Sequence, residues 1–156
     1  MAFQRITGAT PSTPLVTASG TIADINDDNP VTTCEVEGIL DTHFWFVMDL
    51  GSSKPVDEVR LIQWYETGAA DSGFSIAYSD STLGSGNHGT DYGATFSATQ
   101  SPTKQDTTRT PGRVTARYWG LLRVGNFDPN NVGVADFNLY QDVGGGGSRN
   151  LLGVGI

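Results

Sequence analysis

The sequence is poor in cysteine, in basic residues and in long apolar runs. Its one cysteine, Cys34, excludes an internal disulfide. A lone thiol is usually a small buried side chain, so we expect Cys34 in the core, with a reactive or metal-binding role as the alternative. At 156 residues the chain suits one domain, which can bury roughly two thirds of its unfolded surface without a disulfide.

Basic side chains are outnumbered by acidic ones, nine against seventeen, which gives a formal charge of −8. Such a charge repels phosphate backbones and anionic lipid, so we expect neither nucleic acid nor a membrane as partner. No apolar run approaches the ~20 residues of a membrane-spanning helix. Residues 1–5 lack the apolar core of a signal peptide, so we expect synthesis in a cytoplasm without standard export.

A sustained helical period of apolar residues is also missing, and a period of two takes its place. In residues 44–65, Phe46, Met48 and Leu50 alternate with Val47 and Asp49. This pattern predicts a strand over 44–50 and a second over 57–65, joined as a hairpin-like unit by the polar turn 51–55. Further strands are predicted near 73–79, 113–124 and 134–141, with shorter ones near 15–23, 34–40 and 94–98. The chain is therefore predicted to be an all-β sandwich.

The two ends of the chain differ in composition from its middle. Residues 7–21 are rich in Thr, Ser, Pro and Gly, and residues 1–20 are expected to form an extended N-terminal arm before the sandwich of residues 21–143. Inside the sandwich, residues 80–112 form a long polar excursion that is either functional or contains a short strand pair. Residues 144–156 are a glycine linker and an apolar tail. We expect this tail to dock on a neighbouring subunit of a homo-oligomer through Leu151, Leu152, Val154 and Ile156.

Four motifs occur in an order that is typical of one family: FWFVMDLG at 44–51, GFSIAYSD at 73–80, VTARYWGL at 114–121 and ADFNLY at 135–140. Together they resemble the discoidin, or coagulation factor 5/8 type C, family. The resemblance implies a galactose-binding-like jelly-roll sandwich, and binding rather than catalysis. Cys34 stands where the family usually has Trp, and Gly120 stands where Arg is common.

Residues 24–33 crowd three carboxylates and two amides into ten positions. In the family that the chain resembles, a loop of the type Asp-Gly-Asn-x-x-Thr closes around a structural calcium, with a further acid from the closing strand. Calcium takes about six to eight hard oxygen ligands, so main-chain carbonyls would have to contribute. The alternative is an Asx-type turn without metal before Pro30, and Asp28 replaces the family's Gly. The resemblance implies a calcium site made of Asp27, Asn29, Thr32 and Asp136.

Catalytic motifs are missing. The two histidines, His43 and His88, lie outside Gly-x-Ser-x-Gly and His-Glu-x-x-His settings. Glu66 and Asp71 flank a turn and could form a carboxylate pair for glycoside hydrolysis, but acidic side chains on turns are usually just solvated. We therefore expect no enzyme.

Exposed aromatic and polar side chains form three groups, at the end of strand 57–65, in the excursion 80–112 and in the loop before residue 134. Sugar sites combine a flat aromatic face with polar groups that fix hydroxyls, and in related modules such loops gather at one end of the sandwich. Trp45 and Trp119 are expected to pack inside instead. The predicted glycan-binding residues are Trp64, Tyr65, Glu66, Asn87, His88, Tyr92, Phe127 and Asn130.

Two functions fit these features. The apolar tail, the lack of a signal peptide and the lack of an accompanying enzyme favour a structural or binding module of a large assembly. We expect a bacteriophage virion protein of the tail fibre, baseplate or capsid-decoration type that contacts other virion subunits and host surface glycans. The alternative is a stand-alone carbohydrate-binding, lectin-like module.

Overall fold

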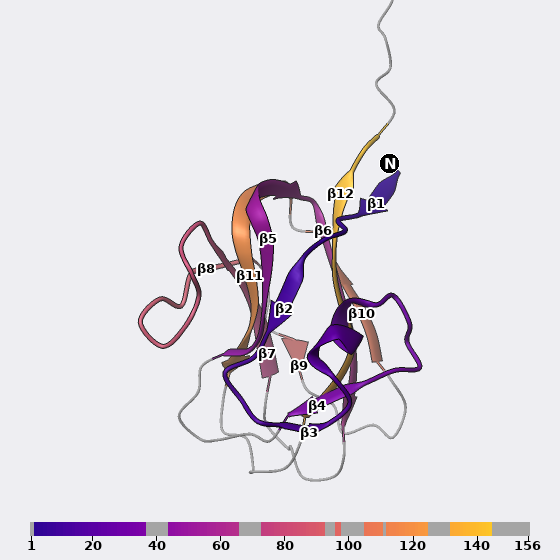
Figure 1. The fold of residues 1–156 in the computed structure, drawn as a ribbon. Helices are drawn as coiled ribbons and strands as arrows, with labels where there is room; N and C mark the ends of the chain where they lie inside the picture. The colour runs from indigo at the N-terminus through magenta and orange to yellow at the C-terminus, as the bar shows by residue number, and fades with distance from the viewer. Residues whose placement is uncertain are drawn as a thin grey trace, which may run out of the picture.

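Two antiparallel sheets pack face to face in the computed structural model, which describes residues 2–36, 44–65, 73–92, 96–97, 105–110, 112–124 and 132–144 (Figure 1). Within these residues, sheet A has the order β10-β6-β12-β4-β3 with β1 beside β12, and sheet B has the order β2-β5-β11-β7-β8 with β9 beside β7. The predicted all-β sandwich is confirmed. The 3-10 turn η1 (Ile22–Asn26) precedes β4, and no helix in the described ranges is long and apolar enough to span a membrane.

The strands of sheet A are β1 (Phe3–Arg5), β3 (Thr17–Ser19), β4 (Cys34–Val36), β6 (Glu58–Tyr65), β10 (Gln105–Arg109) and β12 (Val132–Asp142). Those of sheet B are β2 (Thr10–Ser12), β5 (Phe44–Val56), β7 (Gly73–Ser79), β8 (Thr90–Asp91), β9 (Phe96–Ser97) and β11 (Val114–Val124). Four of the five long strands match the predicted ones within about two residues at each end, and β5 begins as predicted but runs on to Val56.

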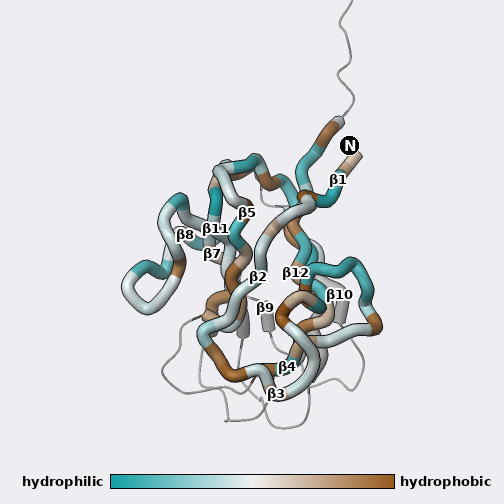
Figure 2. Tube along the Cα trace, viewed as in Figure 1, coloured by the Kyte–Doolittle hydropathy of each residue, from teal (hydrophilic) through white to brown (hydrophobic). Residues whose placement is uncertain are grey.

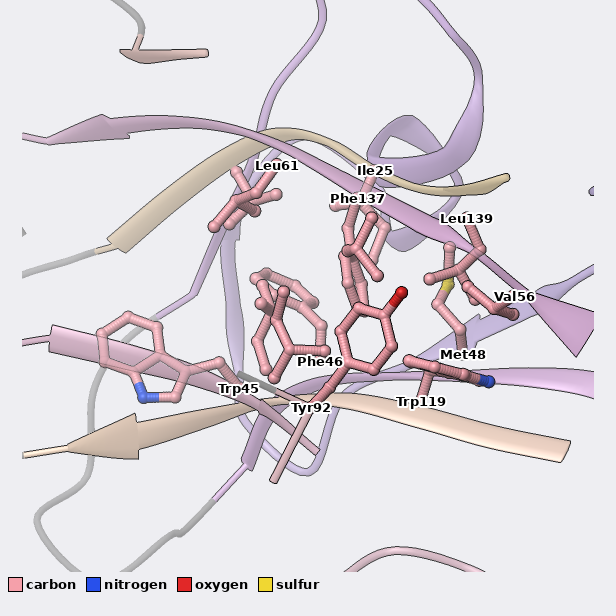
Figure 3. Close-up of a cluster of buried hydrophobic side chains, with 14 of the residues drawn as sticks. Ile25, Trp45, Phe46, Met48, Val56, Leu61, Tyr92, Trp119, Phe137 and Leu139 are labelled. Carbon is pink, nitrogen blue, oxygen red and sulfur yellow. The ribbon is translucent and has the colours of Figure 1, made fainter. Parts of the chain in front are cut away.

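The core lies between the sheets, where alternate residues of each strand point inward. Sheet A contributes Val59, Leu61, Phe137 and Leu139 to it, and sheet B contributes residues from β5 and β11 (Figure 3). Trp45 and Trp119 are fully buried, as predicted. Cys34 is buried as well, and burial raises the pKa of its thiol to about 11, so it is a neutral core side chain at physiological pH.

The predicted hairpin over residues 44–65 is wrong. β5 continues through the supposed turn to Val56 and pairs with β11 in sheet B, whereas β6 pairs with β12 in sheet A. The polar segment is a β-bulge: the Gly51 N–H donates to Asp49 Oδ1 at 2.7 Å, and Gly51 has a φ of +75°, which glycine adopts without steric cost. The turn residues therefore bend one strand, and the chain crosses between the sheets at Asp57.

Asp57 fixes this crossing. Its carboxylate accepts hydrogen bonds from Arg113 Nε and Nη2, both at 2.9 Å, and from the Asp142 N–H at 2.7 Å. Arg113 Nη2 also donates to the Asp142 carbonyl. The hydrogen bond from Arg113 holds the pKa of Asp57 below its usual value. The crossing is thus tied to the start of β11 and the end of β12.

The N-terminal residues are extended, as expected, but they do not form a separate arm. β1 pairs with β12 in sheet A, and β2 pairs with β5 in sheet B. Ile6 and Leu15, which flank β2, are buried in the core. The segment joins both sheets because these two apolar side chains are buried together with the inward faces of the long strands. At the other end of the chain, the predicted docking residues 151–156 lie outside the described residues.

The excursion 80–112 contains three short strands. β8 and β9 extend sheet B, and β10 extends sheet A, so these strands pair with long strands of the sandwich. Between β7 and β8 the chain turns back over the outer face of sheet B (Figure 1). There Leu83 packs in a second apolar cluster with Phe44, Val47 and Ala77. Gly120 lies beneath this cluster, and a Cβ built on it would come within 2.7 Å of the Phe44 ring and 3.0 Å of Leu83. The absent side chain leaves the space that Phe44 and Leu83 occupy.

We predict that Gly120→Ala destabilises the protein by ~1–3 kcal/mol, because the added methyl group overpacks the contact between Phe44 and Leu83. Gly84→Ala is the matched control, since a Cβ there has no neighbour within 4 Å. Urea unfolding of both variants checks this. Equal stability of Gly120→Ala and wild type would show that the cluster yields without cost.

Candidate functional site

One end of the sandwich holds the ends of four long strands, among them β6, which carries the predicted glycan-binding residues Trp64 and Tyr65. At this end Tyr65 of β6 pairs with Val132 of β12, and Gly73 of β7 pairs with Val124 of β11. Trp64 and Tyr65 close β6 there. We call this end of the described strands the loop end. The other predicted residues of these two groups, Glu66, Phe127 and Asn130, lie outside the described residues.

The third predicted group lies elsewhere, because its segment follows the opposite end of β7. Asn87 builds its own loop: Nδ2 donates to Ser79 Oγ at 3.1 Å and to the Ser81 and Thr82 carbonyls, and Oδ1 accepts from the Gly89 N–H at 3.1 Å. These bonds occupy both ends of the Asn87 amide, so it shapes the loop rather than presenting polar groups to a ligand. His88 is exposed, with its ring edge-on to Phe44 at 6.3 Å between centroids.

The prediction that Tyr92 is an exposed ligand residue is wrong. Its side chain is only 4 % exposed and packs edge-on against Trp119, with 4.8 Å between ring centroids (Figure 3). The hydroxyl donates to the Gly112 carbonyl at 3.2 Å, and burial raises the pKa of Tyr92 to about 12. Tyr92 follows β8 directly, and its N–H donates to the Ile76 carbonyl, which turns the ring into the space between the sheets.

We predict that Tyr92→Phe lowers the free energy of unfolding by ~0.5–1.5 kcal/mol, because it removes one buried hydrogen bond and keeps the ring packing. Denaturant unfolding measures the loss, and a ligand titration should show saccharide affinity unchanged. If the folded variant lost saccharide affinity without losing stability, Tyr92 would be a ligand-binding residue after all.

The predicted calcium loop folds as an Asx-type turn. Asp27 Oδ1 accepts from the Asn29 N–H at 2.9 Å, and Asn29 Oδ1 accepts from the Val31 N–H at 3.1 Å. The Thr32 hydroxyl donates to Asp27 Oδ2 at 2.7 Å. Asp28, which stands in place of the family's Gly, has a φ of +62°, a conformation that glycine tolerates better. The side chains of Asp27, Asn29 and Thr32 thus hydrogen-bond within the loop itself.

Asp136, the fourth predicted ligand, lies close to Asp27 and Asp28 of this loop, although it is more than 100 residues away in sequence. It is 2 % exposed and accepts a hydrogen bond from Asn138 Nδ2 at 3.1 Å. Burial raises the pKa of the Asp136 carboxyl above its ordinary value, the bond from Asn138 lowers it, and the nearby carboxylates of Asp27 and Asp28 raise it further. A buried carboxyl thus faces two more acids.

The donor set fits calcium in kind, because it consists of carboxylate, amide, hydroxyl and main-chain oxygens. A cation between Asp136 and the loop would relieve the repulsion that raises the pKa of Asp136. In the parts of the chain that the structure describes, however, no three His, Cys, Asp or Glu side chains converge as a ready metal cluster. Calcium binding would therefore need main-chain carbonyls of the loop.

A further concave feature was not predicted from the sequence. A groove of about 220 Å³, lined by Gln4, Arg5, Ile6, Thr7, Lys54 and Gln141, lies where β1, β12 and β5 end, away from the loop end. Its lining comes from three segments that are far apart in the sequence, and none of them carries a motif. No sequence signal could therefore have revealed it.

Comparison with known proteins identifies the fold. No protein-family model matches the chain, and a comparison with curated proteins finds no match. Among solved structures, the chain is similar to the family 32 carbohydrate-binding module of Clostridium perfringens NanJ in complex with galactose, with a TM-score of 0.61, 13% identity, and coverage of 90% of this chain and 100% of that one. It is equally similar to CBM32-1 of a family 31 glycoside hydrolase from Clostridium perfringens, with a TM-score of 0.62, 10% identity, and coverage of 88% and 96%.

The CBM32 module of AlyQ in complex with 4,5-unsaturated mannuronic acid gives a TM-score of 0.54 and 22% identity, and covers 89% of this chain and 98% of that one. In larger neighbours the match is confined to a part: the chain spans 34% of a truncated AlyQ with CBM32 and alginate lyase domains and 27% of SpGH29. The fold is therefore the galactose-binding-like jelly-roll that the sequence resemblance implies.

Proposed function

We propose that this chain is a non-enzymatic carbohydrate-binding module with its ligand site at the loop end. One observation carries the proposal: the fold matches whole carbohydrate-binding modules over 96% and 100% of their length, not fragments of catalytic domains. The jelly-roll supplies a rigid frame, and β6, which carries the predicted residues Trp64 and Tyr65, ends at the loop end. The comparison favours the stand-alone carbohydrate-binding module over the virion component.

The virion role, its subunit partners and the homo-oligomer stay predictions. The sequence argument for them rests on the tail, and residues 145–156 lie outside the described residues. Nothing in the fold opposes a carbohydrate-binding module that serves within a larger assembly.

We predict that the full chain binds saccharides, with galactose as the first probe, and that Trp64→Ala weakens binding about fivefold to tenfold. The reason is that an aromatic face at the loop end contributes ~1 kcal/mol or more to sugar stacking. Isothermal titration calorimetry against a panel of mono- and oligosaccharides measures both effects.

The matched control is Trp64→Phe, which keeps an aromatic face and should retain most of the affinity. Unfolding midpoints of both variants exclude a general loss of structure. If no saccharide in the panel binds, the proposed function is contradicted, and if Trp64→Ala binds like wild type, the site is not at Trp64.

We further propose that the loop 27–32 takes up calcium, with Asp27, Asn29, Thr32 and Asp136 as its side-chain ligands. The support is the buried Asp136 beneath two acidic residues and the oxygen-only donor set. The bound ion would stabilise the loop and take no part in chemistry.

We predict that calcium raises the unfolding temperature of wild type and leaves Asp136→Asn unchanged. At about 100 times its dissociation constant, calcium would stabilise the folded state by ~2.7 kcal/mol. Without calcium, we expect wild type to be less stable than Asp136→Asn. Because the pKa of Asp136 is raised on folding, its ionisation costs stability as pH rises through that pKa, so Asp136→Asn is the more stable protein at neutral pH.

The amide introduced by Asp136→Asn can donate to Asn138 Oδ1, a buried atom without a partner among the described residues. Magnesium at the same concentration controls for ionic strength. Equal unfolding temperatures of wild type in calcium and in chelator would show that the Asx-type turn needs no metal.

A further inference from the structure

The groove at the end of the sandwich opposite the loop end gathers hydrogen-bond donors. Gln4 of β1 and Gln141 of β12 are register partners, and residues directly opposite each other in neighbouring antiparallel strands share a face. Lys54 reaches the same groove from β5 of the other sheet. Two amides and one ammonium thus line a space of about 220 Å³ with no carboxylate among its lining residues.

The residues that line this groove carry positive charge and no acid. The described residues give Lys54 no ion-pair partner, and two nearby acids are paired with arginines: Asp57 with Arg113 at 2.9 Å and Asp49 with Arg117 at 2.7 Å. In a chain with a formal charge of −8, a groove with cations and no acid is a local reversal of sign. Such a reversal favours an anionic ligand.

Arg5 adds to this charge without blocking the groove. It is the register partner of Tyr140, and its Nη1 donates to the Asn26 carbonyl at 3.0 Å. The alternation of side chains along β1 turns the guanidinium away from the face that carries Gln4. Arg5 therefore makes the electrostatic potential at the rim of the groove more positive. Lys54, Gln4 and Gln141 are the residues that can contact a ligand directly.

We propose that this groove binds the carboxylate of an acidic monosaccharide such as a hexuronate. Lys54 meets the carboxylate, and the amides of Gln4 and Gln141, which both donate and accept, meet the ring hydroxyls. The volume is below the ~300 Å³ of sites for drug-sized ligands, which suits a single sugar ring. This is a second site, distant from the loop end, and it does not depend on the proposed function there.

The test is a titration of the ¹⁵N-labelled full chain with galacturonate, with galactose as the neutral probe and acetate as the simple anion. Galacturonate should shift the amide resonances of residues 4–7, 54 and 141, and galactose should not shift them. Lys54→Gln should weaken galacturonate binding about fivefold to tenfold, as expected for the loss of one charge-assisted hydrogen bond. Gln141→Glu, which places a carboxylate in the groove, should abolish it.

Lys104→Gln is the charge-matched control, because it removes the same charge from the only other lysine of the chain. The proposal is overturned if galacturonate leaves these resonances unmoved, if both lysine variants weaken binding equally, or if acetate binds as tightly as galacturonate. Shifts by galactose at residues 64 and 65 report on the loop end instead, so the two sites succeed or fail separately.

Discussion

The rest of the structure depends on the apolar interface between the two sheets. Phe137 and Leu61 from sheet A and Trp119, Phe46 and Tyr92 from sheet B fill it, and Figure 3 shows their side chains between the strands. Each fully buried large side chain contributes ~1.5–3 kcal/mol. Figure 2 shows apolar stretches along the central strands and also in parts of the connecting segments. Residues outside the strands, such as Ile25 and Leu15, also belong to this core.

Polar contacts hold the connections at the ends of the sandwich in place. Asp57 ties the crossing between the sheets to Arg113 and to the end of β12, and Asp136 lies under the loop 27–32 at a β-bulge between Val134 and the acid itself. On the outer face of sheet B, Gly120 leaves room for Leu83 and Phe44, where the family that the sequence resembles commonly has Arg. The covered face of sheet B and the loop end are thus different surfaces of the sandwich.

Sequence patterns predicted the long strands well and the connections poorly. The alternation around Phe46 and Met48 is local information, so β5 was found, but its partner was misjudged. Gly51 and its neighbours carry the same signal for a turn and for a bulge, since both need a residue with positive φ. Tyr92 was misplaced for a similar reason, because a lone aromatic residue in a polar segment does not reveal that it points into the core.

The sequence by itself determined the all-β class, the buried tryptophans, the neutral core thiol of Cys34 and the acidic character, since composition and residue alternation act locally or as sums over the chain. The tertiary structure decided which sheet each strand joins, how residues 2–20 close both sheets, and that Asp136 meets the loop 27–32. It alone formed the groove of Gln4, Lys54 and Gln141. The physical reason is that β1 and β12 come from opposite ends of the chain, and contacts between such distant residues exist only after the strands have paired.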